Sequence, residues 1–336
     1  MTDLAPRFAF DGAAVTGALE PHRPGLTAHC YRMLGSAFDA EDALQETFIR
    51  AWRGIDRFEG RSELRSWLYR IATNVCLDML AGRARRALPM SLEPPSSGRG
   101  DLGEPLGEAT WVTPVPDRLV LASDSDPATS VVARDSIRLA FVAALQHLQP
   151  RPRAVLLLRD VLGWHAAEVA DLLETTVTAV NSMLRRARQT MAERDTSRDA
   201  GTGTNESEWG VVARYVDAFQ RFDIEALVAL LRDDAIVSMP PIPGWLRGRA
   251  AIGQHWHSRG SACRGSRLRL TRANGLHALG AYRPGPAGDH HAFGITVLDI
   301  AGGRITALHA FLEPRLFPLF ALPDRLPAGE VHERSA

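Results

Sequence analysis

The period of the hydrophobic residues changes along this chain, and that change constrains the fold more than any other feature. Apolar residues recur every three or four positions from about residue 26 to 88, from about residue 128 to 192, and again after residue 206, which predicts helices. From about residue 267 they alternate in short runs, which predicts strands. Helices followed by strands indicate an α+β arrangement for the last segment.

Two polar stretches divide these segments, so the predicted fold class is multidomain, with two all-α domains followed by an α+β domain. The acidic stretch has 2 Arg against 7 acids and is too polar and broken to bury a core, although it contains Trp111. The expected boundaries are an N-terminal extension (1–24), a first helical domain (25–88), an acidic linker (89–127), a second helical domain (128–195), a short linker (196–205), the α+β domain (206–323) and a C-terminal tail (324–336).

A pair of helices is predicted in the first helical domain, on either side of a break at residues 56–62 (DRFEGRS). Gly60 lies in the break, and Ser62 with the acids around it is typical of a helix start. The apolar stripes of the two helices are Leu44, Phe48, Trp52 and Ile55 in the first, and Leu64, Trp67, Leu68, Ile71 and Val75 in the second.

The second helical domain has the pattern of a helix-turn-helix, with Thr175 and Thr176 between two helical segments. In the second helix, Val177, Val180, Leu184, Ala187 and Met191 form an apolar stripe. The other face carries Asn, Ser and Arg, which suit base edges and phosphates in a major groove. An ordinary helix with a solvated basic face explains the same pattern, so both interpretations stay open on these residues alone.

Composition narrows the class of protein. No apolar run approaches the ~20 residues of a membrane-spanning helix, and the N-terminus lacks a secretory signal, so a cytoplasmic location is expected. Cys30, Cys76 and Cys263 have no metal-ligand spacing, so we expect free thiols and predict no metal or cofactor. The net charge is zero, which does not exclude a nucleic-acid partner because local patches set the field.

The stretch DALQETFIRAWRGIDRFEGRSELRSWLYRIATNVCLDML, which starts at Asp42, resembles conserved region 2 of the extracytoplasmic function (ECF) subfamily of sigma-70 factors. The helix-turn-helix then resembles region 4, which reads the promoter −35 element. The order of the two regions and the linker between them also match that family. The resemblance covers roughly residues 25 to 195.

This resemblance implies two protein partners, the clamp helices of the largest subunit of core RNA polymerase and the flap of the second-largest subunit. The DALQET helix would dock on the clamp through Asp42, Gln45 and Glu46, a polar, acidic face suited to an Arg-rich partner. A solvated helix face is the alternative. The acidic linker would thread the polymerase near the active-site cleft and the RNA exit path, or serve only as a tether.

Promoter DNA is the third partner that the resemblance implies, and the FEGRS break would capture a flipped base of the −10 element. The residues implied for the −10 element are Phe58, Gly60, Arg61, Ser62, Arg65, Tyr69, Arg70 and Asn74. Trp67 would be a strand-separating wedge, although its place in the apolar stripe favours core packing. The residues implied for the −35 element are Asn181, Ser182, Arg185, Arg186 and Arg188.

After residue 206 the chain resembles a SnoaL-like domain, a cone-shaped α+β fold, and the Trp-containing linker is similar to that of the SigG-like group of these factors. The resemblance implies an apolar cavity, with Met239 and Trp245 as candidate pocket residues. The candidates for acid–base chemistry are His255, His257, His277, His291, His309 and Glu313. They form no convincing catalytic constellation, so no catalytic residue is predicted.

These observations predict a sigma factor that directs promoter-specific initiation, with a tail that regulates it by docking on the sigma regions or by sensing a small apolar ligand. One alternative is a cyclase-type or isomerase-type enzyme, or a ligand sensor, fused to a helix-turn-helix module. Another is a helix-turn-helix regulator that acts without polymerase. The sequence leaves the existence of an anti-sigma partner open.

Overall fold

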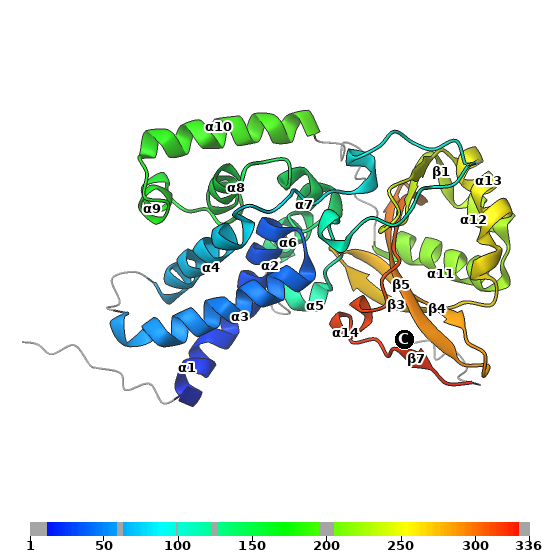
Figure 1. The fold of residues 1–336 in the computed structure, drawn as a ribbon, viewed down its shortest axis with the longest axis horizontal. Coiled ribbons are helices and arrows are strands. Elements are labelled where there is room, and N and C mark those ends of the chain that lie inside the picture. The colour runs from blue at the N-terminus through cyan, green and yellow to red at the C-terminus, as the bar shows by residue number, and fades with distance from the viewer. Residues whose placement is uncertain (1–11, 59–62, 99, 122–126, 195–204, 329–336) are drawn as a thin grey trace, which may run out of the picture. The chain divides into compact units, whose positions relative to one another are not determined.

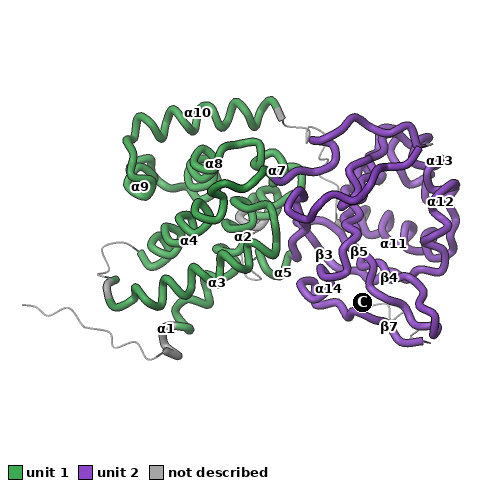
Figure 2. Tube along the Cα trace, in the orientation of Figure 1, with its two compact units in different colours: residues 1–85, 117–195 green, residues 86–116, 196–336 purple. Residues whose placement is uncertain are grey.

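The computed structural model describes residues 12–58, 63–98, 100–121, 127–194 and 205–328. The chain divides into two compact units (Figure 2), one of residues 1–85 with 117–195 and the other of residues 86–116 with 196–336. Within the described residues no helix is long and apolar enough to cross a membrane. Each unit is described below by itself.

Helices make up the first unit (Figure 1). They are α1 (Gly12–Leu19), α2 (Arg23–Leu34), α3 (Ala37–Gly54), α4 (Leu64–Leu80), α5 (Asp117–Val120), α6 (Pro127–Asp135), α7 (Leu139–Leu145), α8 (Pro150–Leu156), the π-helical turn Leu157–Val161, α9 (Ala166–Leu172) and α10 (Val177–Arg194). Helix α2 is buried from Leu26 to Leu34 and packs against α3 and α4. The helical bundle predicted from the period of the sequence is confirmed.

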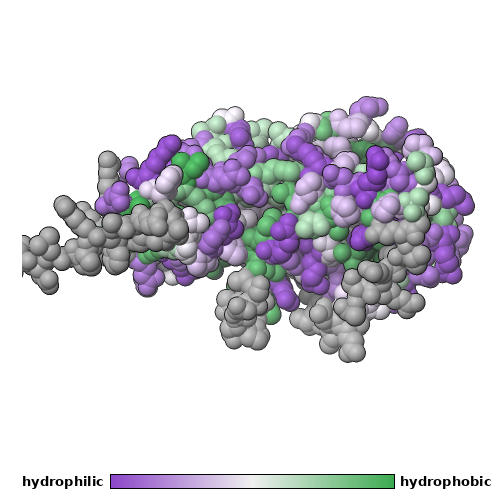
Figure 3. Space-filling view, turned by 90° about the horizontal axis from the view of Figure 1, so that it is seen from below, coloured by the Kyte–Doolittle hydropathy of each residue, from purple (hydrophilic) through white to green (hydrophobic). Residues whose placement is uncertain are grey.

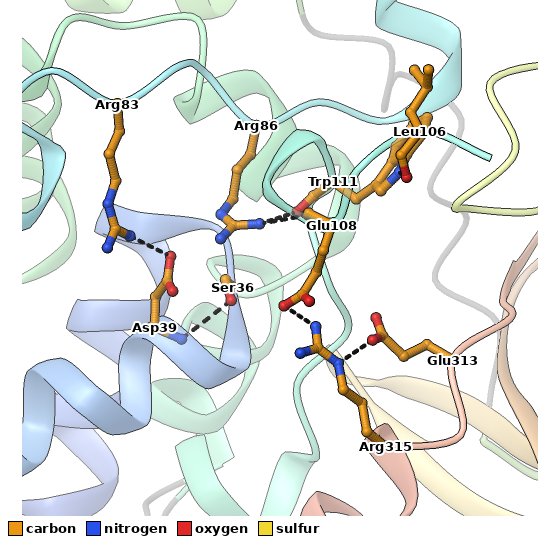
Figure 4. Close-up of polar contacts among 9 residues, drawn as sticks. All are labelled: Ser36, Asp39, Arg83, Arg86, Leu106, Glu108, Trp111, Glu313 and Arg315. Atoms are coloured by element: carbon orange, nitrogen blue, oxygen red, sulfur yellow. Dashed lines mark hydrogen bonds and ion pairs between the residues drawn. The ribbon is translucent and has the colours of Figure 1, made fainter.

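The junction of α2 and α3 shows how the local sequence sets this bundle. Helix α2 ends at Gly35, whose φ of 70° is a left-handed conformation that glycine adopts without strain. Ser36 then caps α3, because its hydroxyl accepts a hydrogen bond of 3.2 Å from the Asp39 amide (Figure 4). Arg83, which follows α4, pairs with the Asp39 carboxylate at 3.0 Å. The chain therefore turns sharply between the two helices.

A buried polar network joins the two helical segments of this unit. Arg153 on α8 donates hydrogen bonds to the Met33 carbonyl and, at 2.7 Å, to the side-chain oxygen of Gln146. Arg32 donates to the Ser136 hydroxyl at 3.0 Å. Burial lowers the pKa of Arg153 to about 10. Removing one partner of a buried, paired cation is costly, so these contacts hold α2 and α8 in one unit.

The second unit contains the sheet and the helices that cover it. Its elements are α11 (Asn205–Arg221), α12 (Ile224–Ala229), β1 (Leu231–Ser238), β2 (Trp245–Arg247), α13 (Arg249–Arg259), β3 (Arg267–Ala273), β4 (Leu276–Pro284), β5 (His290–Ala301), β6 (Arg304–Phe311), α14 (Leu316–Leu319) and β7 (Arg325–Leu326). The strand order is β2-β1-β6-β5-β4-β3, and β7 pairs with β5. Only β1 and β6 are parallel among these described pairs.

The core of the second unit lies between helices α11 to α13 and one face of the sheet. Val212 from α11, Leu227 from α12 and Ile252 from α13 pack in one cluster with Val237 of β1 and Leu308 of β6. Gly302 and Gly303, both with positive φ, form the predicted hairpin turn between β5 and β6. The α+β architecture expected for this segment is therefore confirmed.

The acidic segment is more ordered than a tether. Residues 86–116 fold with the second unit, and Leu102 joins its hydrophobic core. Trp111, Val112 and Val115 are buried as well. Residues 117–120 form α5 in the first unit, so the folded part of the predicted linker is divided between the two units.

Candidate nucleic-acid and polymerase interfaces

The helix-turn-helix consists of α9, a turn at residues 173–176, and α10. Glu174 adopts a positive φ of 50°, and the Thr175 amide donates to the Ala170 carbonyl at 2.9 Å, which closes the turn. The Thr176 hydroxyl then accepts a hydrogen bond of 3.1 Å from the Ala179 amide and caps α10. These contacts fix the direction in which α10 leaves the turn.

Helix α10 buries one face and exposes the other, as predicted. Val180, Leu184 and Ala187 are buried, whereas Val177 at the start of the predicted stripe is 43% exposed. The opposite face presents the residues proposed for the −35 element. Asn181, Arg185 and Arg186 are exposed, and Ser182 is half-buried.

Arg188 differs from its neighbours on α10 because it already has a partner. Its guanidinium makes two hydrogen bonds to the Asp160 carboxylate, at 2.6 and 2.9 Å. Arg185 and Arg186 have no carboxylate partner among the described residues. A phosphate contact by Arg188 would have to replace a bidentate ion pair, whereas Arg185 and Arg186 can meet DNA without that exchange.

The outward face of α3 carries the residues proposed to dock on polymerase. Asp42 and Gln45 are exposed, and Glu46 pairs with Arg50 at 2.7 Å. Arg50 also reaches Asp78 on α4 at 3.1 Å. Among the described residues Asp42 has no ion-pair partner, while Glu46 is partly neutralised.

Two large hydrophobic side chains extend this face, and the apolar period did not indicate that either is exposed. Ile49 is 42% exposed and Trp52 is 61% exposed, at i+7 and i+10 from Asp42. The assignment of Trp52 to the buried stripe is wrong, because Trp52 lies outside the side of the helix that packs against the bundle. The buried face of α3 consists of Ala37, Ala40, Ala43, Leu44, Thr47 and Ala51. An exposed Trp beside polar residues is typical of a protein interface.

The residues proposed for the −10 element lie in different settings. Phe58 packs on Trp67 with ring centroids 5.1 Å apart, and Trp67 lies against Gly54. Gly60, Arg61 and Ser62 lie outside the described residues. The half-buried position of Trp67 agrees with core packing more than with a free wedge.

Tyr69 is enclosed in this structure, and its proposed contact with a base stays a prediction. It is only 4% exposed, and its ring packs edge-on against His29 with centroids 5.4 Å apart. Arg65 covers the ring at 5.5 Å. Burial raises the pKa of Tyr69, so the phenol stays neutral inside the bundle.

Arg70 and Asn74 are exposed one turn apart on α4 and can still reach a single strand. Asn74 also lines a groove of about 710 Å³ with Asp78, Arg151 and Glu174. The groove brings α4 together with α8 and the turn of the helix-turn-helix inside the first unit.

The tail domain has a partly open apolar cavity of about 150 Å³ beneath α11 to α13. Met239 lines this cavity, as expected, but Trp245 does not. Strand alternation explains the difference, because Trp245 pairs with Ser238, whose neighbours Val237 and Met239 both line the cavity. The Trp245 indole instead donates to the Glu93 carbonyl at 2.7 Å.

None of the predicted acid–base candidates lines this cavity. His309 points away from it, between the lining residues Leu308 and Ala310, and its Nδ1 lies 2.8 Å from the Ser238 hydroxyl. Burial lowers the pKa of His309 to about 4. The remaining acid–base candidates lie elsewhere in the tail domain. They are His255 and His257 on α13, His277 on β4 against the Trp209 ring, His291 at 3.0 Å from Asp289, and Glu313, which pairs with Arg315.

The acidic segment is fastened to the tail domain by main-chain hydrogen bonds. The Ser96 amide donates to the Trp245 carbonyl at 2.7 Å, and the Leu106 amide donates to the Pro241 carbonyl at 2.9 Å. Between them, the Gly244 amide donates to the Leu102 carbonyl at 2.8 Å. A Cβ at position 244 would lie 2.4 Å from that carbonyl oxygen, so the close approach requires glycine.

Side chains secure the rest of the same segment (Figure 4). Arg86 donates to the Glu108 and Trp111 carbonyls at 3.1 and 2.9 Å, and the Glu108 carboxylate pairs with Arg315. Further along, Val115 exchanges two hydrogen bonds with Asn274, at 3.0 and 3.1 Å. We define residues 93–115 as the strap.

The surface of the molecule mixes hydrophilic and hydrophobic residues on the face drawn in Figure 3. Large exposed hydrophobic side chains among the described residues include Ile49 and Trp52 on α3 and Trp209 on α11. Single exposed apolar residues are ordinary on a protein surface. The pair on α3 stands out because it adjoins the predicted polymerase contacts.

Comparison with known families and proteins agrees with this geometry. Three family models match in order, Sigma-70 region 2 at residues 18–86, Sigma-70 region 4 at residues 138–191 and a SnoaL-like domain at residues 212–308. The chain is 49% identical over 314 residues to the ECF RNA polymerase sigma factor SigG of Mycobacterium tuberculosis, a match that covers 91% of this chain and 83% of that protein.

A second sigma factor of the same organism supports the fold. The crystal structure of the extracytoplasmic function sigma factor SigJ of Mycobacterium tuberculosis superposes with a TM-score of 0.59 at 23% identity, covering 92% of this chain and all of that one (100%). The identity with SigG and the ordered matches to both sigma regions carry the assignment. The chain therefore belongs to the extracytoplasmic function subfamily of RNA polymerase sigma factors.

Proposed function

We propose that this chain binds core RNA polymerase, directs transcription from promoters with −10 and −35 elements, and is held back by its own tail through the strap. The observation that carries the regulatory part is the set of main-chain hydrogen bonds between residues 96–106 and residues 241–245. These residues are part of the segment that connects region 2 with region 4. Whatever holds this segment controls how the two regions can be placed on a promoter.

The exposed face of α10 supports the role in −35 recognition. Asn181, Arg185 and Arg186 present amide and guanidinium groups to solvent, and such groups read adenine and guanine edges in a major groove. Each good bidentate contact contributes about 1–3 kcal/mol of discrimination between bases. The buried side of the helix, formed by Val180, Leu184 and Ala187, keeps that face turned outward.

The outward face of α3 supports the role in polymerase binding. Asp42 and Gln45 supply polar contacts, and Ile49 with Trp52 supply apolar area that this unit leaves exposed. A buried aromatic anchor surrounded by polar contacts is the usual energetic centre of a protein interface. We infer that Trp52 is this anchor, together with the acidic contacts predicted from the sequence.

The strap supports a regulatory role for the tail. In the sigma factors that this chain resembles, the linker between regions 2 and 4 would thread the polymerase cleft. In this chain the same segment buries Leu102 in the tail core and pairs its backbone with the tail. A backbone group cannot hold both positions at once, so we infer that the strap must leave the tail before the holoenzyme forms.

Catalysis by the tail is the second candidate function, and the cavity argues against it. Among the described residues, the cavity lining contains no carboxylate and no imidazole. Carboxylates and imidazoles are the commonest groups for proton transfer to a bound ketone, and the lining offers Tyr215 and Cys263 instead. The geometry supports binding of a ligand more than acid–base chemistry on it.

Run-off transcription with core polymerase tests the proposal. We expect a promoter-dependent transcript only when the full-length chain is present, and a stronger transcript from Leu102→Ala, because that change weakens the strap by roughly 2–5 kcal/mol. Leu92→Ala is the matched control, since Leu92 is 41% exposed in the same segment. Absence of any transcript would exclude the sigma-factor function of this chain. Equal output from Leu102→Ala, Leu92→Ala and wild type would exclude control by the strap.

A further inference from the structure

The cavity of the tail domain has an apolar wall and one polar end. Its volume is about 150 Å³, and a cavity of about that size in another protein holds a single benzene ring. The apolar wall includes Phe219, Leu227, Met239 and Leu308. A molecule with one ring or a short aliphatic chain therefore fits this space.

Arg283 is the charged residue of the described cavity lining, and its position on β4 aims it inward. Ala281 and Arg283 both line the cavity, while Tyr282 between them packs on Phe317 with ring centroids 5.0 Å apart. The β3–β4 ladder ends with the pair Arg267 and Tyr282, and the adjoining residues Ser266 and Arg283 both line the cavity. The hydroxyl and the guanidinium therefore belong to the same end of the cavity, which is its polar end.

Both of these side chains have donors without a partner. The Nε of Arg283 and the hydroxyl oxygen of Ser266 are buried and make no hydrogen bond. The guanidinium lies 3.4 Å from the centre of the Phe293 ring and its Nη2 is 4.0 Å from the Cys263 sulfur. In the part of the chain that the structure describes, no carboxylate pairs with Arg283.

The Arg283 guanidinium is half-buried and stacks on Phe293, but its Nε is buried beside the apolar cavity and has no acceptor. A buried donor without a partner is costly, so a ligand that brings a hydrogen-bond acceptor to this point is favoured. Tyr215 lines the same cavity, and its hydroxyl is a further donor group. Burial raises the pKa of Tyr215, which keeps that hydroxyl protonated. Among the described residues, the polar end therefore has several hydrogen-bond donors and no carboxylate.

We propose that this cavity binds a small monocarboxylic acid with an apolar body. The carboxylate accepts hydrogen bonds from the Arg283 guanidinium and the Ser266 hydroxyl, and the ring or short chain lies against Phe219, Met239 and Leu308. The proposal rests on the proposed function in one respect, because such an acid would be the signal that the tail senses. The binding itself does not depend on transcription.

Calorimetric titration of the full-length protein with three acids, phenylacetate, benzoate and hexanoate, tests the proposal, with phenylacetamide as the neutral match. We expect at least one acid to bind, and phenylacetamide to bind at least about ten-fold more weakly than phenylacetate. Arg283→Met should weaken acid binding by roughly 10–100-fold, the usual effect of losing a charge-assisted hydrogen bond. Arg214→Met removes an exposed arginine of α11 outside the cavity and should change nothing.

Three results would overturn the proposal. They are failure of all three acids to bind, equal affinity for phenylacetate and phenylacetamide, and wild-type acid affinity in Arg283→Met. Met239→Trp fills the cavity and should abolish binding of the acid, so unchanged binding by that variant would also exclude this site. Ser266→Ala, with an expected loss of about 3–10-fold, keeps the test decisive if Arg283→Met does not fold. Run-off transcription is not part of this measurement, so failure of the pocket and failure of the sigma-factor function are distinguishable.

Discussion

Gly244→Ala tests the strap from the side of the tail, without changing any residue of the strap. The Cβ of alanine at this position would lie 2.4 Å from the Leu102 carbonyl oxygen and 2.7 Å from its Cα. Both atoms belong to the backbone, so no side-chain rotation relieves the clash. The strap must move by roughly 1 Å, because ordinary contacts of this kind begin near 3.4 Å.

Gly244→Ala changes the free energy that holds the strap on the tail in two ways. Overpacking of this kind costs about 1–3 kcal/mol, and the displaced strap loses the hydrogen bond of 2.8 Å from Gly244 to Leu102, which contributes about 0.5–1.5 kcal/mol. The sum, roughly 2–4 kcal/mol, shifts the equilibrium between held and released strap by about 30-fold to 1,000-fold.

Amide hydrogen exchange measures this shift directly. We expect the amides of Ser96 and Leu106, which donate to the tail, to exchange faster in Gly244→Ala by about that factor, and run-off transcription to rise. Gly210→Ala is the matched control, because nothing lies within 4 Å of a Cβ at that position. Unchanged exchange at Ser96 and Leu106 would refute the contact. Faster exchange without more transcript would refute its regulatory meaning.

Three further predictions concern the interfaces and pH. Arg185→Ala should reduce the discrimination of the holoenzyme between −35 sequences by roughly 5–150-fold. Arg188→Ala should alter this discrimination little, because Arg188 is already paired with Asp160. Competition transcription on templates with different −35 sequences measures both effects. Trp52→Ala should weaken affinity for core polymerase at least ten-fold in a pull-down titration with an unchanged melting temperature, since Trp52 is 61% exposed. Burial lowers the pKa of His309 from 6.5 to about 4. Between pH 6.5 and 4 its imidazole is therefore neutral in the folded chain and protonated in the unfolded chain, so the free energy of unfolding should fall as the pH drops through this range. His309→Gln should reduce that dependence in thermal melts but not abolish it, because burial also lowers the pKa values of His29 and His277. The exposed His257→Gln should leave the dependence unchanged.

Much of the fold follows from patterns that are short in sequence. The stripe of Val180, Leu184 and Ala187 on α10 and the strand alternation of β3 to β6 depend on neighbours within a few residues. Backbone geometry fixes these periods at 3.6 and 2, so the sequence is enough to place the elements and their buried faces. The same locality explains why Asn181, Arg185 and Arg186 were predicted on the exposed face.

Residues that depend on distant partners were predicted less well. Trp52 was assigned to a buried stripe, but it lies outside the side of α3 that packs against the bundle. Period alone also gave no sign that His29 and Arg65 would enclose Tyr69. Period alone cannot distinguish a large apolar residue on the boundary of a stripe from one at its centre.

The strap shows most clearly what the sequence alone could not predict. Its composition, acidic and rich in Pro and Gly, predicted a linker and could not indicate that Leu102 enters a core formed by residues more than 100 positions away. The buried donors of Arg283 and Ser266 that lack a hydrogen-bond partner could not be predicted for the same reason, because only the folded sheet brings both residues to one cavity. By itself the sequence determined the helices, the strands and the sigma-factor family, since each depends on local periods and motifs. The tertiary structure alone decided what holds the linker and where the tail has room for a ligand, because these depend on which distant side chains and backbone groups meet.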